Sequence, residues 1–431
     1  MGRELVLDIL LSITRDGEYS HIALRRVLDK YGYLEKKERA FITRVTEGTL
    51  ERMLELDFII NQFSKVPVNK MKPVIRTIIR SAVYQMKYMD SVPNSAVCNE
   101  AVKLAVKRGF VNLKGFVNGL LRNIERNLDT IKYPDRSDIL AYLSITYSMP
   151  EWILKQWLSD YSEEVVEQIL KEFLKEKPLS VRFNEKRISK AELMQKLMHE
   201  GVQACEHPTL PYALLLSGID YLGALPSFCG GDFQVQDISS MKVAEAAVPR
   251  PGDYIIDVCA APGGKSLHLA EKLDGTGMVE ARDLTEAKVG LIEENIHRTG
   301  LKNIRVVRQD ATEYTVDAKE KADIVIADLP CSGLGVLGRK TDLKYKMTEA
   351  LQKQLVELQR QILSVVKAYV KPGGKLIYST CTIHRAENQE NAAWFAGKYQ
   401  DFKLLSEKQI LPGEDGGDGF YIGVFKRDRY G

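Results

Sequence analysis

Two cysteines, each directly after an apolar run, are the residues in this chain best suited to covalent chemistry. Cys331 follows the run DIVIADLP, and Cys381 follows KLIYST. A single cysteine in such a place is usually a buried apolar residue. Because parallel strands end at the same edge of a sheet, two cysteines at neighbouring strand ends instead favour a catalytic pair, and Asp328 stands close to the first of them.

Such a pair suits methyl transfer to carbon 5 of a cytosine. That carbon is a poor nucleophile, so a thiolate must first add to carbon 6, and a base must later remove the proton from carbon 5. The chemistry therefore requires a methyl donor bound beside the two cysteines.

A glycine-rich loop in DVCAAPGGKS, residues 257–266, offers a site for a nucleoside. Gly263 and Gly264 allow a tight turn and a close approach of a ligand, and the amides of the following helix point toward it. Lys265 and Ser266 match the end of the phosphate-binding motif G-x-x-x-x-G-K-[ST], but that motif needs a glycine where this chain has Cys259. The dinucleotide motif G-x-G-x-x-G is absent from the loop as well. A nucleoside-binding loop and a purely structural turn remain.

Two aspartates after later apolar runs fit the same pocket. Asp283 lies 19 residues beyond Gly264, where nucleoside-binding sheets place a carboxylate against ribose hydroxyls. Asp310, in RQDAT, ends the third run in a position suited to the edge of an adenine. Alone, each acid would more commonly be solvated or cap a helix. Together they predict a nucleoside pocket without a phosphate anchor, which S-adenosylmethionine fits.

A doubly wound α/β sheet over residues 236–431 is expected to position these residues. Short apolar runs alternate there with helical stretches, which indicates buried parallel strands. Ligands bind beyond the carboxyl ends of the strands in such sheets. The expected strands are YIIDVCA, GMVEARD, IRVVRQD, DIVIADLP and KLIYSTC.

Residues 1–130 predict an all-α bundle, because apolar residues recur at helical spacing, most clearly over residues 75–86. Arg76, Arg80 and Lys87 lie off that apolar stripe, and we expect them to face water or phosphate. The region is basic, with 22 lysines and arginines against 15 acidic residues. Residues 131–235 predict a small α+β connector with a strand in PLSVRFN, residues 178–184.

Composition excludes several classes of protein. No run reaches the roughly 18 apolar residues of a membrane helix. Glu4 and Asp8 interrupt the N-terminus where a signal peptide would be apolar. The six cysteines form no C-x-x-C pair, so neither a disulfide framework nor a zinc site is expected. We expect a cytoplasmic monomer that carries no metal and does not attach to membranes.

The motifs resemble those of the bacterial RsmB (Sun/Fmu) ribosomal RNA cytosine-5 methyltransferases over nearly the whole chain. VTEGTLERMLELDFII and GFVNGLLRNI resemble the NusB-type RNA-binding bundle of that family. FQVQDISSM, DVCAAPGGKS, DLPCSGLG, YSTCTIHRAENQ and GDGFYIGVFKR then follow in the family's order. The resemblance implies a NusB-like bundle, a connector and a Rossmann-like methyltransferase domain. It also implies S-adenosylmethionine as cofactor and 16S ribosomal RNA as substrate, methylated at cytosine 967.

The resemblance further implies a role for each site residue. Cys381, in the S-T-C-T motif, matches the nucleophile, and Cys331, in the P-C motif, matches the thiol that helps to release the product. Asp328 and Lys265 are implied to hold the cytosine through nitrogen 3 and neighbouring atoms. The residues implied to contact the cofactor or to edge its pocket are Cys259, Ala260, Ala261, Pro262, Gly263, Gly264, Lys265, Asp283, Asp310 and Asp328.

The segment after the P-C motif departs in part from the family pattern. In GVLGRKTDLKY, Gly338 and Thr341 stand where arginine and proline are common, whereas Arg339, Asp342 and Lys344 match. These departures concern the choice of substrate more than the reaction.

Two alternatives remain open. In a DNA cytosine-5 methyltransferase the P-C cysteine would be the nucleophile, and the S-T-C motif and the NusB-like bundle argue against this. In a non-catalytic RNA-binding assembly factor the sheet would be a degenerate scaffold. Such a scaffold has no need for both Cys331 and Cys381.

Overall fold

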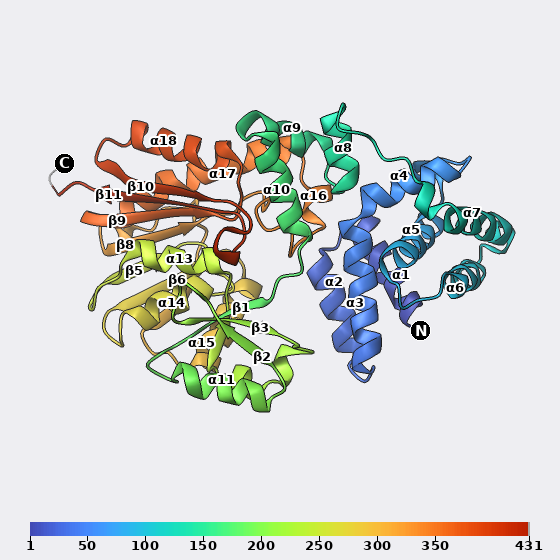
Figure 1. Cartoon of the computed structure of the whole chain (residues 1–431). Coiled ribbons are helices and arrows are strands. Elements are labelled where there is room, and N and C mark those ends of the chain that lie inside the picture. The colour runs from blue at the N-terminus through green and yellow to red at the C-terminus, as the bar shows by residue number, and fades with distance from the viewer. Residues whose placement is uncertain (430–431) are drawn as a thin grey trace. The chain divides into compact units, whose positions relative to one another are not determined.

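The computed structural model describes residues 1–429, which divide into two compact units (Figure 1). The helical unit comprises Met1–Leu174 and a returning segment, Leu337–Met347. The sheet unit comprises Lys175–Val336 and the chain from Thr348 onward. The domain boundaries expected from the sequence, at residues 130 and 235, remain a prediction.

The helical unit is all-α, as the periodicity of residues 1–130 predicts. Proline residues open two of its helices: Pro73 is the first residue of one, and Pro93 directly precedes another. Short 3₁₀ turns lie at Val68–Lys70, Val111–Leu113 and Leu128–Thr130. The α-helices are α1 (Gly2–Thr14), α2 (Ser20–Lys30), α3 (Lys36–Glu51), α4 (Met53–Phe63), α5 (Pro73–Tyr88), α6 (Asn94–Lys107), α7 (Lys114–Arg126), α8 (Ile139–Thr146), α9 (Glu151–Asp160), α10 (Glu163–Leu174) and α16 (Leu343–Lys346).

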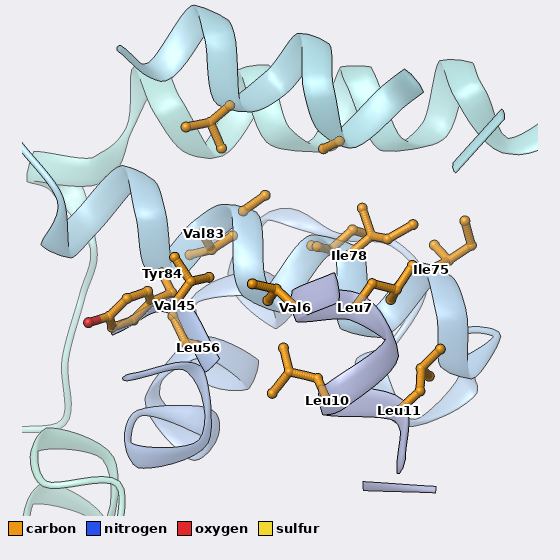
Figure 2. Packing of buried hydrophobic residues seen from close by; sticks show 14 of the residues in the cluster. Val6, Leu7, Leu10, Leu11, Val45, Leu56, Ile75, Ile78, Val83 and Tyr84 are labelled. Atoms are coloured by element: carbon orange, nitrogen blue, oxygen red, sulfur yellow. The ribbon is translucent and has the colours of Figure 1, made fainter. Parts of the chain in front are cut away.

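The core of this unit forms where α1 and α5 meet (Figure 2). Leu7 and Leu10 of α1 and Ile75 and Ile78 of α5 are almost fully buried, and each such side chain contributes about 1.5–3 kcal/mol to folding. Tyr84 packs closely against α3, because a Cβ at Gly48 would overlap its ring. The apolar stripe read from the sequence is therefore the packing face of α5.

The expectation that Arg80 faces water or phosphate is wrong. Arg80 is only 9% exposed, and its guanidinium pairs with the Asp57 carboxylate through Nε (2.6 Å) and Nη2 (2.5 Å). A bidentate pair of this kind neutralises a charge that would be costly to bury alone. Because Asp57 lies on α4, the periodicity of α5 gives no sign of this pairing.

The sheet unit begins with a small antiparallel sheet of order β2-β3-β1-β4. Its first strand coincides with the strand predicted over residues 178–184. Val181 and Phe233 are buried between this sheet and the helix that follows its first strand. The elements are β1 (Leu179–Phe183), α11 (Lys190–His199), β2 (Gln203–Glu206), β3 (Ala213–Ser217), α12 (Pro226–Cys229) and β4 (Phe233–Val235).

The larger sheet has seven strands in the order β10-β11-β9-β8-β5-β6-β7. The five predicted runs are its parallel strands, and the two C-terminal strands pair antiparallel at one edge. The strands are β5 (Tyr254–Asp257), β6 (Met278–Asp283), β7 (Ile304–Arg308), β8 (Ala322–Asp328), β9 (Val370–Thr380), β10 (Phe402–Ile410) and β11 (Phe420–Arg427).

Helices cover both faces of this sheet, as a doubly wound fold requires. One face packs on α13 (Ile238–Ala247), α14 (Gly264–Lys272) and α15 (Glu286–Thr299), and the other on α17 (Glu349–Val366) and α18 (Gln389–Lys398). None of the helices within residues 1–429 is long and apolar enough to cross a membrane.

Candidate active site

The glycine-rich loop joins β5 to α14 at the carboxyl edge of the larger sheet. Gly263 has a φ of +105°, a conformation that favours glycine, and α14 begins at the next residue. Gly263 N–H donates to the carbonyl of Ala260 (2.7 Å), and Ala260 N–H donates to the carbonyl of Arg282 on β6 (2.8 Å). The loop is therefore held tightly against the end of the neighbouring strand.

Asp257, the last residue of β5, is a buried acid that the sequence reasoning did not select. Ser266 Oγ donates to its Oδ2 (2.6 Å). Burial raises the pKa of Asp257 to about 7, and the nearby charge of Asp328 raises it as well. The sequence feature that points to Asp257 as a site residue is its place as the first residue of the DVCAAPGGKS motif.

Asp283 ends β6, as predicted, and braces the loop. Its Oδ2 accepts a hydrogen bond from Ala261 N–H (2.9 Å), and its Oδ1 accepts one from Leu284 N–H (2.8 Å). Lys288 Nζ lies 3.1 Å from Oδ1. A carboxylate has about four acceptor positions, so these bonds leave room for a ligand hydroxyl.

Two other predicted cofactor residues lie on the same edge. Asp310 is two residues beyond β7, and its Oδ1 accepts hydrogen bonds from Thr312 N–H (2.8 Å) and Thr312 Oγ1 (2.7 Å), which lower its pKa. Burial, together with the charges of Asp257 and Asp283, raises the pKa of Cys259. Cys259 therefore stays a neutral thiol and is unsuited to act as a nucleophile.

Lys265 and Asp328 form an ion pair at the strand ends. Lys265 Nζ donates to Asp328 Oδ2 (2.7 Å), and Ser379 Oγ donates to the other carboxylate oxygen (2.7 Å). Burial opposes the charged form of Lys265, but Asp328, Asp257 and Cys381 outweigh it and raise its pKa.

Cys331 and Cys381 come together because β8 and β9 are neighbouring parallel strands. Their sulfur atoms lie 3.2 Å apart. The hydrogen bond with Cys381, followed by burial, raises the pKa of Cys331 well above its ordinary value. Both effects favour the thiol form of Cys331.

A buried carboxylate, Glu387, links the two cysteine loops. Its Oε2 accepts from Ser332 N–H (2.8 Å) beside Cys331 and from Gln359 Nε2 (3.1 Å) on α17. On the other side, Ser332 Oγ lies 2.9 Å from Thr382 Oγ1, next to Cys381. Neither Glu387 nor Gln359 is predicted from the sequence to be a site residue. Glu387 lies inside YSTCTIHRAENQ, but Gln359 belongs to no motif.

These groups fit S-adenosylmethionine better than a nucleotide phosphate. The ammonium of Lys265 is committed to Asp328 and is not free to anchor a phosphate. The acids Asp257, Asp283 and Asp328 lie along the same edge, so no unpaired cation of the described residues gathers there to bind a phosphate. Within residues 1–429, no cluster of three or more His, Cys, Asp or Glu side chains could hold a metal ion.

Rossmann-like methyltransferases have a mostly parallel sheet, a glycine-rich loop after the first parallel strand, an acid at the end of the next strand and no phosphate anchor. The sheet unit has this arrangement, with the loop after β5 and the acid at the end of β6. Three families match the chain: 16S rRNA methyltransferase RsmB/F over residues 244–426, NusB over residues 2–126, and the ferredoxin-like domain of RsmF/B-like methyltransferases over residues 149–219.

Whole proteins match as well. The chain is 35% identical to the probable ribosomal RNA small subunit methyltransferase B of Bacillus subtilis (strain 168), with 97% of each chain covered. It is 33% identical to the protein of the same description from Synechocystis sp. (strain ATCC 27184 / PCC 6803 / Kazusa), with 99% of each covered. The chain belongs to the ribosomal RNA small subunit methyltransferase B family. S-adenosylmethionine is its cofactor, as the sequence predicts.

Solved structures show the same fold. The crystal structure of PH0851 covers 99% of this chain with a TM-score of 0.84 at 24% identity, and 98% of that chain is covered. A methyltransferase homolog protein from Pyrococcus horikoshii covers 68% of this chain with a TM-score of 0.59 at 24% identity, and 100% of that chain is covered.

Proposed function

We propose that this protein transfers a methyl group to carbon 5 of a cytosine in 16S ribosomal RNA, and that the cytosine is position 967. The observation that carries the proposal is the pair of sulfur atoms 3.2 Å apart at two neighbouring strand ends. One sulfur can form the covalent bond to carbon 6, and the other lies close enough to assist its release. The family relatives, named as small subunit ribosomal RNA methyltransferases, support the choice of RNA.

The loop between β5 and α14 and the ends of β6, β7 and β8 would hold the cofactor. S-adenosylmethionine supplies an electrophilic methyl group when it is bound. Asp283 would accept hydrogen bonds from the ribose hydroxyls, and Asp310 would lie at the adenine edge. The backbone of residues 259–264 would line the pocket, with Lys265 and Asp328 at its border.

Cys381 would begin the reaction as a thiolate. Its sulfur adds to carbon 6, and the electron pair of the carbon 5–carbon 6 double bond makes carbon 5 nucleophilic. Carbon 5 would then form its bond to the methyl group while the bond between that methyl and the donor sulfur breaks, and the electron pair of that bond would stay on the sulfur. A base would take the carbon 5 proton, and the electron pair left behind would restore the double bond as the bond from Cys381 to carbon 6 breaks and Cys381 leaves as a thiolate. Cys331 lies against Cys381 and would assist this last step.

Lys265 and Asp328 would hold the cytosine ring. Asp328 presents carboxylate oxygens beside the cysteines, and a cytosine can donate to them from its amino group and, once nitrogen 3 is protonated, from that nitrogen as well. Lys265 holds Asp328 in place through the 2.7 Å contact. The basic bundle of residues 1–130 would bind RNA phosphates.

Incubation of the protein with unmodified 16S ribosomal RNA and a labelled methyl donor tests the proposal. We expect label in 5-methylcytosine at position 967, identified by mass spectrometry of RNase fragments. A DNA enzyme would instead label duplex DNA, and a non-catalytic assembly factor would bind the RNA without transferring label. Label on another nucleotide would show that the substrate position is wrong while the chemistry stands.

A further inference from the structure

Cys381 lies between two buried threonines at the carboxyl end of β9. Thr380 and Thr382 are each 0% exposed, whereas Cys381 is partly exposed. A partly exposed nucleophile between two buried neighbours takes its position from them, because the chain on either side fixes its Cα. The contacts of the two threonines therefore decide where the sulfur of Cys381 lies.

The side chain of Asn388 contacts both threonines. Its Oδ1 accepts a hydrogen bond from Thr380 Oγ1, and its Nδ2 donates to the carbonyl of Thr382 (2.9 Å). Asn388 is itself fully buried, and all of these residues belong to the sheet unit. One amide therefore holds the residues immediately before and immediately after Cys381.

These contacts need an amide at position 388. A carboxylate accepts hydrogen bonds but donates none, so it could serve Thr380 but not the carbonyl of Thr382. Asn388 Nδ2 also donates to Gln409 Oε1 (2.8 Å) on β10. Gln409 Nε2 in turn donates to the carbonyls of Phe420 (2.9 Å) and Thr382 (3.3 Å). Gln409 therefore fixes the orientation of the Asn388 amide, because turning either amide over would set oxygen against oxygen.

Asn388 directly precedes α18, where it could have served as the cap of that helix. An asparagine in this place usually accepts a hydrogen bond from an N–H group in the first turn. The side chain of Asn388 makes no such bond, and its oxygen accepts from Thr380 instead. Tyr378 Oη donates to the carbonyl of Glu387 and so ties the same turn of the chain to β9. The side chain is therefore committed to the loop of Cys381 rather than to the helix.

We propose that Asn388 is a positioning residue that holds Cys381 for its addition to carbon 6, and that Gln409 holds Asn388 in turn. The proposal deepens the function proposed above and rests on it. Displacement of a reacting group by about 1 Å can slow catalysis by about 100-fold. Loss of these contacts should therefore lower the rate of methyl transfer and leave the affinity for the cofactor unchanged.

Two variants of nearly unchanged shape remove the contacts. Asn388→Asp removes both hydrogen bonds that Nδ2 donates, and Thr380→Val removes the hydroxyl that donates to Asn388. Asn303→Asp is the matched control, because Asn303 is 7% exposed and its Nδ2 donates to the carbonyl of Ala270 (2.8 Å). Asn303 directly precedes β7, at the edge of the parallel strands opposite Cys381.

The three variants and the wild type are compared by thermal unfolding, calorimetric binding of S-adenosylmethionine and single-turnover methylation of saturating 16S ribosomal RNA at several cofactor concentrations. We expect the maximal rate to fall about tenfold or more in Asn388→Asp and about threefold or more in Thr380→Val. The half-saturating cofactor concentration should stay at the wild-type value in both. Asn303→Asp should lose stability and keep the wild-type rate.

A wild-type rate in a folded Asn388→Asp protein overturns the proposal. If that variant does not fold, Thr380→Val decides, and a wild-type rate there overturns the proposal as well. A rate loss that Asn303→Asp shares, or that accompanies weaker cofactor binding, also overturns it, since general destabilisation then explains the effect. A wild type that transfers no methyl group to the RNA is the failure of the proposed function. The two failures are therefore distinguished within one experiment.

Discussion

At 3.2 Å, the sulfur atoms of Cys331 and Cys381 can share a single proton, and their surroundings decide which of them holds it. The hydrogen bond with Cys381 and burial raise the pKa of Cys331 and favour its thiol form. Two chemically identical side chains thereby acquire different expected roles.

The two cysteines should therefore fail differently when each is replaced. Cys381→Ala should abolish turnover and form no covalent complex, because nothing adds to carbon 6. Cys331→Ala should still methylate but stall as a protein–RNA adduct that survives denaturing electrophoresis. The opposite pattern would assign the roles as in DNA enzymes, and full activity in both variants would disprove the covalent mechanism.

Asp283 should govern cofactor affinity rather than chemistry, because a ribose contact is equally strong in the ground and transition states. Asp283→Ala also removes the acceptor for Ala261 N–H, which loosens the loop. We expect the KM for S-adenosylmethionine to rise about tenfold or more, equivalent to at least about 1.4 kcal/mol. Asp317→Ala, an exposed acid on the same unit, is the control. A lowered kcat at unchanged KM would contradict this assignment of the pocket.

At the scale of elements, the two cysteine loops depend on a shared carboxylate rather than on the strands alone. Glu387→Ala should leave Ser332 N–H without its acceptor, at a cost of about 1–3 kcal/mol in stability, while Gln359 Nε2 keeps only the carbonyl of Pro330 (2.8 Å). Thermal unfolding should show the loss, and kcat should fall because both loops shift. Wild-type kcat in a destabilised variant would mean that Glu387 serves folding alone.

The segment 337–347 should give the helical unit a distinctive pH dependence through Lys344. Burial lowers the pKa of Lys344 to about 7, with Glu51 raising it and Arg52 lowering it to smaller extents. Between pH 7 and the ordinary lysine pKa of about 10.4, the unfolded chain holds a proton that the folded chain lacks. The contribution of Lys344 to stability should therefore rise with pH across this window, by up to about 1.4 kcal/mol per pH unit.

Lys344→Met should remove that contribution. The unfolding free energy of the wild type minus that of the variant should increase as the pH rises from 7 to 10. Denaturant unfolding at several pH values measures it. A difference independent of pH would show that Lys344 is charged in the folded protein throughout.

At the scale of the whole molecule, removal of residues 1–130 should separate cofactor binding from RNA binding. The sheet unit has its own core clusters, so the truncated chain should fold and bind S-adenosylmethionine. RNA affinity and its dependence on salt should both fall, because the basic helices are gone. Filter binding at several salt concentrations measures both quantities.

The truncation also removes Ser20 and Glu51, the partners of Asp342 and Lys344. Unchanged RNA affinity after the truncation would place recognition elsewhere in the chain.

The sequence by itself determined the helical bundle, the five parallel strands and the edge at which Cys331, Cys381, Asp283 and Asp328 end. These features follow from local periodicity, because a helix or a buried strand repeats its apolar residues within a few positions. The order of consecutive strands then places β8 beside β9 and brings the cysteines together. The motifs added the cofactor, and the transfer to carbon 5 of a cytosine that they predict stays a prediction.

Only the tertiary structure decided which polar groups pair. Three pairings join elements that no spacing in the sequence relates. They are Arg80 with Asp57, Glu387 with the loop of Cys331, and Asp342 with Ser20. The last pair is separated by 322 positions. A buried polar group must find a partner wherever packing places one, so its role follows from the fold and cannot be read from its neighbours in the chain.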